Sequence, residues 1–391
     1  MTDDDNNQSQ KTSQMSRRDV LKNVLGASAA VTGSAILGGT PSEAEAGPLR
    51  NLLSTFIEGN FRIDVHCHHI PDFYRQSLAD YGITSAGGVD LPSWSPEEAV
   101  KFMNLHGIQT QVVSISEPGV YYLPDPAQRK EMAWRINDYT NEYLIHSNNS
   151  YLKNRFGGFA VLPIGDTSNT LDIDNACREA ERAINVLGME GVGLYSNYNG
   201  TYLGDPSLDP LMETLNDLGA MVFVRPVTPQ AMPDLDLPTF LFEFPFDTTR
   251  AVVNLTYKNV LLKYPNIRWL LAHAGGTIPF LAYRTSLLRL YPAIAQNLGL
   301  DAFDDGGAAY AKLFYDTALS PAPTAMKSVR EVTEVSHIMF ASDWPFSKQV
   351  FTLPGDPAPQ LEDSFNDDEL RKVLRDNALD QFPQLKQRLQ S

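Results

Sequence analysis

The chain has 391 residues, of which 43% are apolar, and a formal net charge of −16. This length and apolar content are enough for one large domain or two ordinary ones. So acidic a protein lacks the basic stripe that binds nucleic acid, and two cysteines outside any Cys-x-x-Cys pair exclude a disulfide framework.

The first 46 residues have the features of an export signal. Ser16-Arg17-Arg18-Asp19-Val20-Leu21-Lys22 resembles a twin-arginine motif, a run of apolar and small residues follows it, and Ala44-Glu45-Ala46 fits a small-x-small cleavage site. The apolar run is shorter than the roughly 20 residues of a membrane span. We predict a signal over 1–46, a linker over 47–60, and export to the periplasm or the extracellular space. The alternative is a disordered tail with a chance Arg-Arg pair on a cytoplasmic protein.

The run Ile63-Asp64-Val65-His66-Cys67-His68 predicts a strand that carries two metal ligands. Side chains alternate between the faces of a strand, so His66 and His68 share one face and Cys67 points to the other. Two imidazoles on one face suit a borderline divalent cation such as zinc. On spacing alone, the alternative is a pair of surface histidines at a strand end.

Strand patterns and helix patterns then alternate to the end of the chain. The predicted strands are 61–67, 111–116, 156–162, 191–196, 220–225, 268–273, 312–317 and 337–342. One predicted helix, 168–187, places Ile173, Ala176 and Ala180 on a single apolar stripe. Eight strands alternating with helices predict an α/β fold, a (β/α)8 TIM barrel with insertions over 61–391. A doubly wound open sheet is the alternative.

Polar residues follow several of the predicted strands at their carboxyl ends. His66 and His68 end the first strand, His273 ends the sixth, and Asp343 follows the eighth. In a barrel these positions meet on one rim, where the active sites of this fold lie. The prediction therefore depends on two imidazoles and a distant carboxylate converging on one cation.

These motifs resemble the amidohydrolase superfamily. Asp64-Val65-His66-Cys67-His68, His273-Ala274-Gly275-Gly276 and Ser342-Asp343-Trp344-Pro345 are similar to its branch of metal-dependent decarboxylases, typified by aminocarboxymuconate-semialdehyde decarboxylase. Glu243-Phe244-Pro245-Phe246-Asp247 and Trp94-Ser95-Pro96 look closer to 6-methylsalicylate decarboxylases. The resemblance covers about residues 61–390.

The resemblance implies a role for each matching position. His66, His68 and Asp343 correspond to metal ligands, with zinc or manganese as the divalent metal. His273 corresponds to the sixth-strand histidine that works on the substrate or on metal-bound water. We expect His273 and Asp343 to be the catalytic residues that transfer the proton. Arg284 corresponds to an arginine that binds the substrate carboxylate, in some members from a neighbouring subunit, which implies a homodimer.

The chain departs from the family at the fifth strand, where Arg225 stands in place of a histidine ligand. A guanidinium has no lone pair to donate and remains a cation. Three explanations are open. His273 takes over as a ligand; or Arg225 binds the substrate carboxylate while the metal is weak or absent; or catalysis is lost and binding remains.

The resemblance implies a carboxy-lyase that removes CO2 from a small aromatic, salicylate-like or unsaturated carboxylic acid. A divalent cation supplies Lewis-acid stabilisation in such chemistry, and a carboxyl or imidazole group supplies the proton. Two alternatives use the same residues: a metal-dependent hydrolase of an ester, lactone or amide, and a ligand-binding barrel without catalysis.

Overall fold

The computed structural model describes residues 61–287, 292–297, 306–350 and 356–390. The predicted signal over 1–46 and the linker over 47–60 lie outside the described residues. Within the described residues, no helix combines the length and the apolar character that crossing a bilayer requires.

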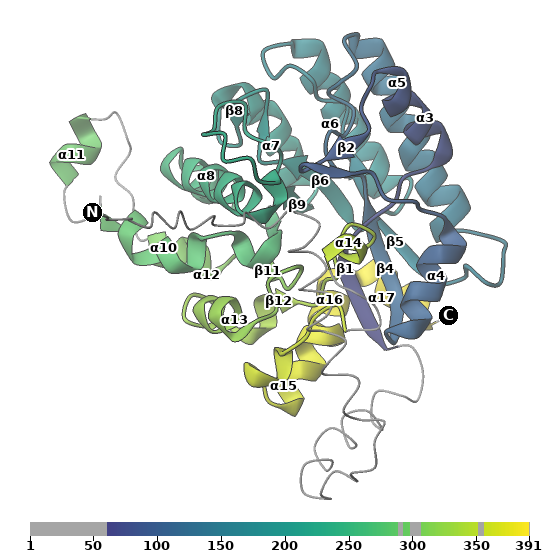
Figure 1. Ribbon diagram of the computed structural model, residues 1–391. Coiled ribbons are helices and arrows are strands. Elements are labelled where there is room, and N and C mark those ends of the chain that lie inside the picture. Colours follow the sequence, from purple (N-terminus) through teal and green to yellow (C-terminus); the bar gives the residue numbers. More distant parts are fainter. Residues whose placement is uncertain (1–60, 288–291, 298–305, 351–355, 391) are drawn as a thin grey trace, which may run out of the picture. The chain divides into compact units, whose positions relative to one another are not determined.

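Eight parallel strands form the centre of the fold (Figure 1). In their order around the sheet they are β1 (Arg62–His68), β4 (Ile108–Ser114), β5 (Phe156–Val161), β6 (Gly191–Tyr195), β9 (Met221–Arg225), β10 (Arg268–Leu271), β11 (Phe314–Asp316) and β12 (Ile338–Met339). Each overlaps one of the eight predicted strands. Two short hairpins, β2–β3 (Ser85–Ala86 and Val89–Asp90) and β7–β8 (Asn197–Tyr198 and Thr201–Tyr202), are insertions between them.

Backbone hydrogen bonds between the first strand and the chain after the last one close the sheet. Val65 N donates to Phe340 O at 3.0 Å, and His68 N donates to Trp344 O at 2.7 Å. A parallel bridge pairs Cys67 with Trp344. The eighth strand is shorter than the predicted 337–342, because Phe340 N bonds instead to Val373 O at 2.8 Å. The closed ring confirms the predicted barrel and excludes the open sheet.

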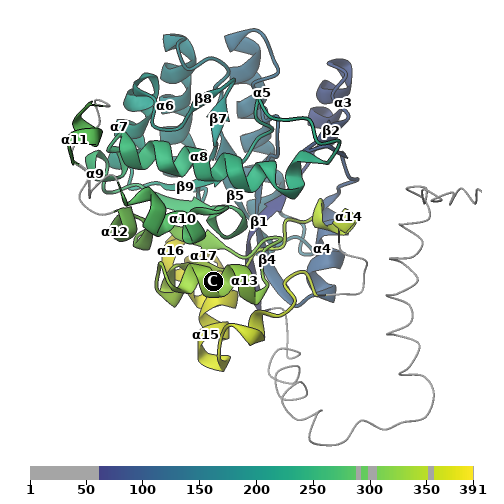
Figure 2. The ribbon, with the colours of Figure 1, turned by 60° about the vertical axis from the view of Figure 1, so that its left-hand side comes forward.

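Helices surround the strands, and the crossovers between consecutive parallel strands place them outside (Figures 1 and 2). The main ones are α3 (Asp72–Asp80), α4 (Pro96–Leu105), α5 (Pro126–Asp138), α6 (Thr170–Asn185), α7 (Asp209–Asp217), α8 (Glu243–Tyr257), α10 (Ile278–Thr285), α12 (Gly306–Ala311) and α13 (Pro323–Arg330). Helix α6 confirms the predicted helix over 168–187 and buries Ile173, Ala176 and Ala180. A π-helical turn over Tyr139–Ile145 continues α5. Helices α8 and α10 lie side by side in both views.

The barrel interior is filled by side chains from its strands, and two C-terminal helices pack against this core. Phe159 and Phe223 meet inside with ring centroids 5.2 Å apart. Phe382, in the short connection between α16 (Asn377–Gln381) and α17 (Pro383–Gln390), reaches Phe159 at 5.8 Å. Truncating a buried phenylalanine to alanine costs about 3–5 kcal/mol. This packing holds the strands in place and leaves their carboxyl ends to form a site.

Candidate active site

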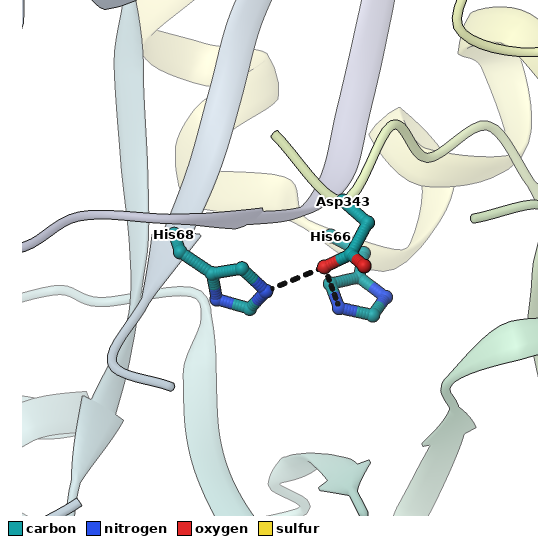
Figure 3. A group of neighbouring side chains, drawn as sticks. All are labelled: His66, His68 and Asp343. Carbon is teal, nitrogen blue, oxygen red and sulfur yellow. Dashed lines mark hydrogen bonds and ion pairs between the residues drawn. The ribbon is translucent and has the colours of Figure 1, made fainter. Parts of the chain in front are cut away.

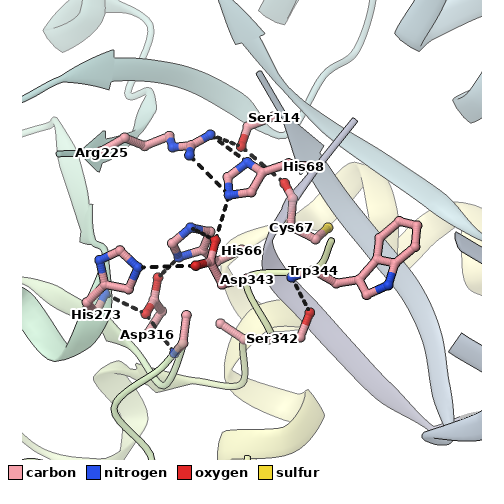
Figure 4. A network of polar contacts seen from close by, with 12 residues as sticks. His66, Cys67, His68, Ser114, Arg225, His273, Asp316, Ser342, Asp343 and Trp344 are labelled. Carbon is pink, nitrogen blue, oxygen red and sulfur yellow. Dashed lines mark hydrogen bonds and ion pairs between the residues drawn. The ribbon is translucent and has the colours of Figure 1, made fainter. Parts of the chain in front are cut away.

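The carboxyl ends of the strands bring the predicted residues together (Figure 4). His66 and His68 belong to β1, Arg225 ends β9, His273 follows β10, and Asp343 follows β12. Each is at most 7% exposed. The sequence predicted that these residues, far apart in the chain, would converge on one rim of the barrel. The structure shows this arrangement.

His66, His68 and Asp343 form a group whose potential ligand atoms lie within 4.8 Å of one another (Figure 3). Asp343 Oδ1 is 2.7 Å from His68 Nε2 and 3.1 Å from His66 Nε2. Burial alone raises the pKa of Asp343, but the charge of His66 and the hydrogen bonds of the histidines outweigh it and hold that pKa well below its usual range. Cys67 points away, with its Sγ 3.5 Å from Val112 O, as the strand alternation predicts.

Asp64 connects the two segments that carry this group. Its carboxylate accepts hydrogen bonds from Gln111 Nε2 at 3.0 Å, from Ser342 Oγ at 2.6 Å and from Ser342 N at 3.0 Å. It also accepts from His66 N at 3.2 Å. Burial raises the pKa of Asp64 to about 6. Asp64 therefore fixes Asp343, whose backbone follows Ser342, against β1.

Asp316 lies behind His66 and orients two histidines. Its Oδ2 is 2.7 Å from His66 Nδ1, and its Oδ1 accepts from the backbone N–H of His273 at 2.8 Å. Burial disfavours a charged His66, but Asp316 and Asp343 outweigh it and raise the pKa of His66 to about 9. Sequence reasoning missed this role: the position of Asp316 at the end of a strand was the only signal for it.

Arg225 lies behind His68 (Figure 4). Its Nη1 is 2.7 Å from Ile115 O, 2.9 Å from Ser114 Oγ and 2.8 Å from His68 Nδ1, and its Nη2 is 3.1 Å from His68 Nε2. Burial and the charge of Arg225 lower the pKa of His68 well below its usual range. Arg225 therefore joins the group through one of the proposed ligands.

His273 has the freest ring of the group. Neither of its ring nitrogens has a hydrogen-bond partner among the described residues, and its Nε2 is 3.7 Å from Asp343 Oδ2. His273 and Asp343 both have a φ of 56°, a left-handed conformation that is rare and strained outside glycine. The bond from His273 N to Asp316 and the bond from Asp343 N to His66 O, 2.8 Å long, hold them there.

A pocket that encloses about 500 Å³, open solvent at its mouth included, lies over these residues. Its polar part consists of His68, Ser116, Arg225, His273 and Asp343. The apolar walls are Ala86, Val89, Pro226, Phe240, Phe244, Leu319 and Phe346. These walls were not predicted from the sequence. They come from segments between or after the barrel strands, among them the β2–β3 hairpin and helix α8, which only the folded barrel brings together.

Arg284 does not line the pocket of its own chain. It lies exposed on α10, outside the described residues that line the pocket. Its predicted contact with a substrate stays a prediction.

The donor atoms fit a divalent cation, and one neighbour opposes it. His66 offers Nε2 while Asp316 takes its Nδ1–H, which is the usual arrangement behind a metal-bound histidine. Asp343 offers a carboxylate, and two imidazoles with one carboxylate suit divalent transition metals. Arg225 places a positive charge beside His68. His273 lies next to the group, within ion-pair distance of Asp343.

Comparison with known proteins agrees with this geometry. The sequence profile of the amidohydrolase family matches residues 63–384, as the motifs predicted. The chain is 31% identical over 335 residues to the decarboxylase yanB of Aspergillus niger, which covers 82% of this chain and 87% of that relative. It is 30% identical over 335 residues to the 6-methylsalicylic acid decarboxylase of Penicillium expansum, covering 83% and 97%.

A solved structure shows the same fold. The 5-carboxyvanillate decarboxylase of Sphingomonas paucimobilis superposes with a TM-score of 0.70 at 21% identity, covering 83% of this chain and 99% of that one. At this identity the similarity concerns the barrel itself.

Proposed function

The chain belongs to the amidohydrolase family, and we propose that it is a carboxy-lyase that removes CO2 from a small aromatic carboxylic acid of the salicylate type, or from an unsaturated acid. The observation that carries this proposal is the buried group of His66, His68, Asp343, His273 and Arg225 at one side of an apolar pocket. The two curated decarboxylases, each about 30% identical over four fifths of the chain, support the same class of reaction.

The pocket walls suit a flat, largely apolar substrate. Phe240, Phe244 and Phe346 offer aromatic surface, and Arg225 is the cationic residue in the lining. A small-molecule pocket of this kind gains affinity from its apolar walls and orientation from a few polar groups. We assign the substrate ring to the aromatic walls and the carboxylate to the side of Arg225, whose Nε has no hydrogen-bond partner among the described residues.

His273 and Asp343 are the groups we assign to the proton. Loss of CO2 leaves negative charge on the ring, and a proton must then reach the carbon that held the carboxylate. His273 lines the pocket and has no other hydrogen-bond partner in the described part of the chain, so its ring nitrogens are available to a substrate. Asp343 Oδ2 lies 3.7 Å from His273 Nε2, so the two groups are close enough to serve one substrate.

We propose that His66, His68 and Asp343 hold a divalent cation, with zinc as the first candidate and manganese as the second. When bound, such a cation supplies Lewis-acid stabilisation of negative charge on the substrate oxygens. The donor set of two imidazoles and a carboxylate supports zinc, which takes nitrogen and oxygen ligands readily.

A homodimer in which Arg284 serves a neighbouring subunit is a further part of the proposal. Helix α10 exposes Phe280 by 83% and Tyr283 by 78%, next to the exposed Arg284. Large exposed aromatic side chains of this kind are typical of protein interfaces. Sedimentation equilibrium of the wild-type protein and of the F280E variant tests it: a wild-type monomer would contradict the dimer.

Export by the twin-arginine route is proposed from Arg17 and Arg18. Cell fractionation of the full chain and of the variant R17K/R18K tests it. Equal distribution of both between the compartments would contradict it.

The reaction is tested by incubating purified protein with salicylate, 6-methylsalicylate and 2,6-dihydroxybenzoate, with and without added zinc or manganese. CO2 release with formation of the corresponding phenol is the expected result. Acid release from an ester, lactone or amide without CO2 would replace the lyase by a hydrolase. Ligand binding without either product would leave a binding protein.

A further inference from the structure

His66 and His68 lie on the same face of β1, but different groups lie behind their rings. Behind His66 is Asp316, with Oδ2 2.7 Å from Nδ1. A carboxylate accepts hydrogen bonds, so Nδ1 of His66 carries the ring hydrogen. In the neutral ring, Nε2 then keeps a lone pair, as a metal ligand requires.

Behind His68 is a group that donates only. Arg225 Nη1 lies 2.8 Å from His68 Nδ1, and every guanidinium nitrogen is a donor. Arg225 Nη2 also lies 3.1 Å from Nε2, but the contact at Nδ1 is the shorter one and Nε2 has the carboxylate of Asp343 as an acceptor. The lone pair is therefore assigned to Nδ1 and the hydrogen of the neutral ring to Nε2. Asp343 Oδ1, 2.7 Å from Nε2, accepts that hydrogen. A nitrogen that bears a hydrogen has no lone pair for a cation.

The guanidinium is fixed in this position. Nη1 also donates to Ile115 O at 2.7 Å and to Ser114 Oγ at 2.9 Å, and Arg225 is 6% exposed. Ser114 Oγ is itself 3.2 Å from Cys67 O and donates to it, so toward Arg225 it is an acceptor. Nη2 lies 3.1 Å from His68 Nε2, so a fixed positive charge lies beside the atom that would bind the cation. Repulsion between two positive charges is strong where water is excluded.

We propose that Arg225 is an antagonist of cation binding: the guanidinium and a divalent cation compete for the imidazole of His68, and the resting protein holds the cation weakly. His66 and Asp343 remain as the residues that can offer a lone pair to the cation. The permanent positive charge of the site is the guanidinium of Arg225. What the cation does in catalysis rests on the proposed function. The competition for His68 concerns binding alone and is measured without substrate.

The binding test uses the full-length protein stripped with chelator, and zinc affinity measured by competition with a colorimetric chelator. R225Q removes the charge and offers an oxygen to His68 Nδ1–H, so its zinc affinity should rise about 10- to 100-fold, the size of effect that partners behind metal ligands have. R225H should gain at least as much because it adds a ligand. R225K, which keeps a cationic donor, should gain nothing. Folded R225Q that binds zinc no more tightly than the wild type would overturn the proposal.

A second measurement needs no change at Arg225. Nitrogen-15 NMR of the histidine rings in the stripped wild-type protein reports which nitrogen carries the hydrogen, and comparison with H68N identifies the signals of His68 among the seven histidines. In the neutral form of each ring, the hydrogen is expected on Nε2 of His68 and on Nδ1 of His66. Finding it on Nδ1 of His68 would refute the competition. Failure of the CO2 assay would leave both binding results unchanged, so the two proposals fail separately.

Discussion

The two histidines of the first strand form two halves of one site that differ in charge. Burial disfavours the charged ring of both. At His66 the carboxylates of Asp316 and Asp343 outweigh burial and raise the pKa to about 9, whereas at His68 the charge of Arg225 adds to burial and lowers the pKa further. The same residue type, two positions apart on one strand face, therefore has opposite proton chemistry.

The difference teaches that the partner of the second ring nitrogen decides what a histidine does. When one nitrogen of a neutral imidazole donates to an acceptor, the other nitrogen keeps a lone pair and can bind a metal. When one nitrogen accepts from a donor, the other nitrogen carries the hydrogen and can donate it. Among the described residues, Asp343 is the one carboxylate that both rings contact, at 3.1 Å and 2.7 Å. Substitutions at Asp343, Asp316 and Ser114 test the shared group and then each half.

The largest effect is expected from D343N, which changes the group shared by both halves. An amide cannot accept hydrogen bonds with both of its terminal atoms, and it cannot carry the proton that the carboxylate of Asp343 is proposed to transfer. CO2 release should fall about 10²- to 10⁴-fold, the range of a lost general acid–base contribution. The thermal melting temperature of the variant serves as the control for folding. Activity within a factor of ten of the wild type would contradict the role of Asp343.

D316N changes the His66 half alone. It removes the charge behind His66 and weakens the acceptor of Nδ1–H, so zinc affinity should fall about 10- to 100-fold. This change in zinc affinity is opposite in sign to the rise expected for R225Q. The two variants together therefore test whether the two halves differ. D356N is the matched control, because Asp356 pairs with Arg62 at 2.7 Å at the surface and should not affect zinc. Unchanged zinc binding in D316N would contradict the role of Asp316 behind His66.

The smallest effect is expected from S114A, which loosens the His68 half. The variant removes the hydroxyl that accepts from Arg225 Nη1 at 2.9 Å but leaves Ile115 O in place. Losing one such bond costs about 1 kcal/mol of stability, measurable by urea unfolding. If the whole of that energy weakens the contact between Arg225 and His68, zinc affinity rises by at most about fivefold. A fall in zinc affinity would contradict the antagonism of Arg225.

Several features of the site were readable from local patterns. Strand alternation placed His66 and His68 together and Cys67 apart, and the structure confirms it. The repeating strands and helices predicted the barrel, and the barrel in turn predicted that residues at strand ends, such as His273 and Asp343, would meet. These features follow from periodicities of two and about 3.6 residues, which any short window of the chain carries.

Other features came from contacts between distant parts of the chain. His66 and Asp316 are 250 positions apart, and His68 and Arg225 are 157 apart. Walls such as Phe240 and Phe244 come from a segment with no strand pattern of its own. The barrel predicted that residues at strand ends would lie near one another, but no local window contains both members of such a pair, so the particular contact between the two side chains could not be predicted.

The amino-acid sequence by itself determined the barrel, the rim that holds the chemistry and the presence of an arginine where a ligand is expected. The tertiary structure decided which way that arginine points and therefore which nitrogen of His68 holds a hydrogen. The physical reason is that periodicity depends on neighbours along the chain, whereas the state of an imidazole depends on whatever donor or acceptor folding places about 3 Å from its nitrogens.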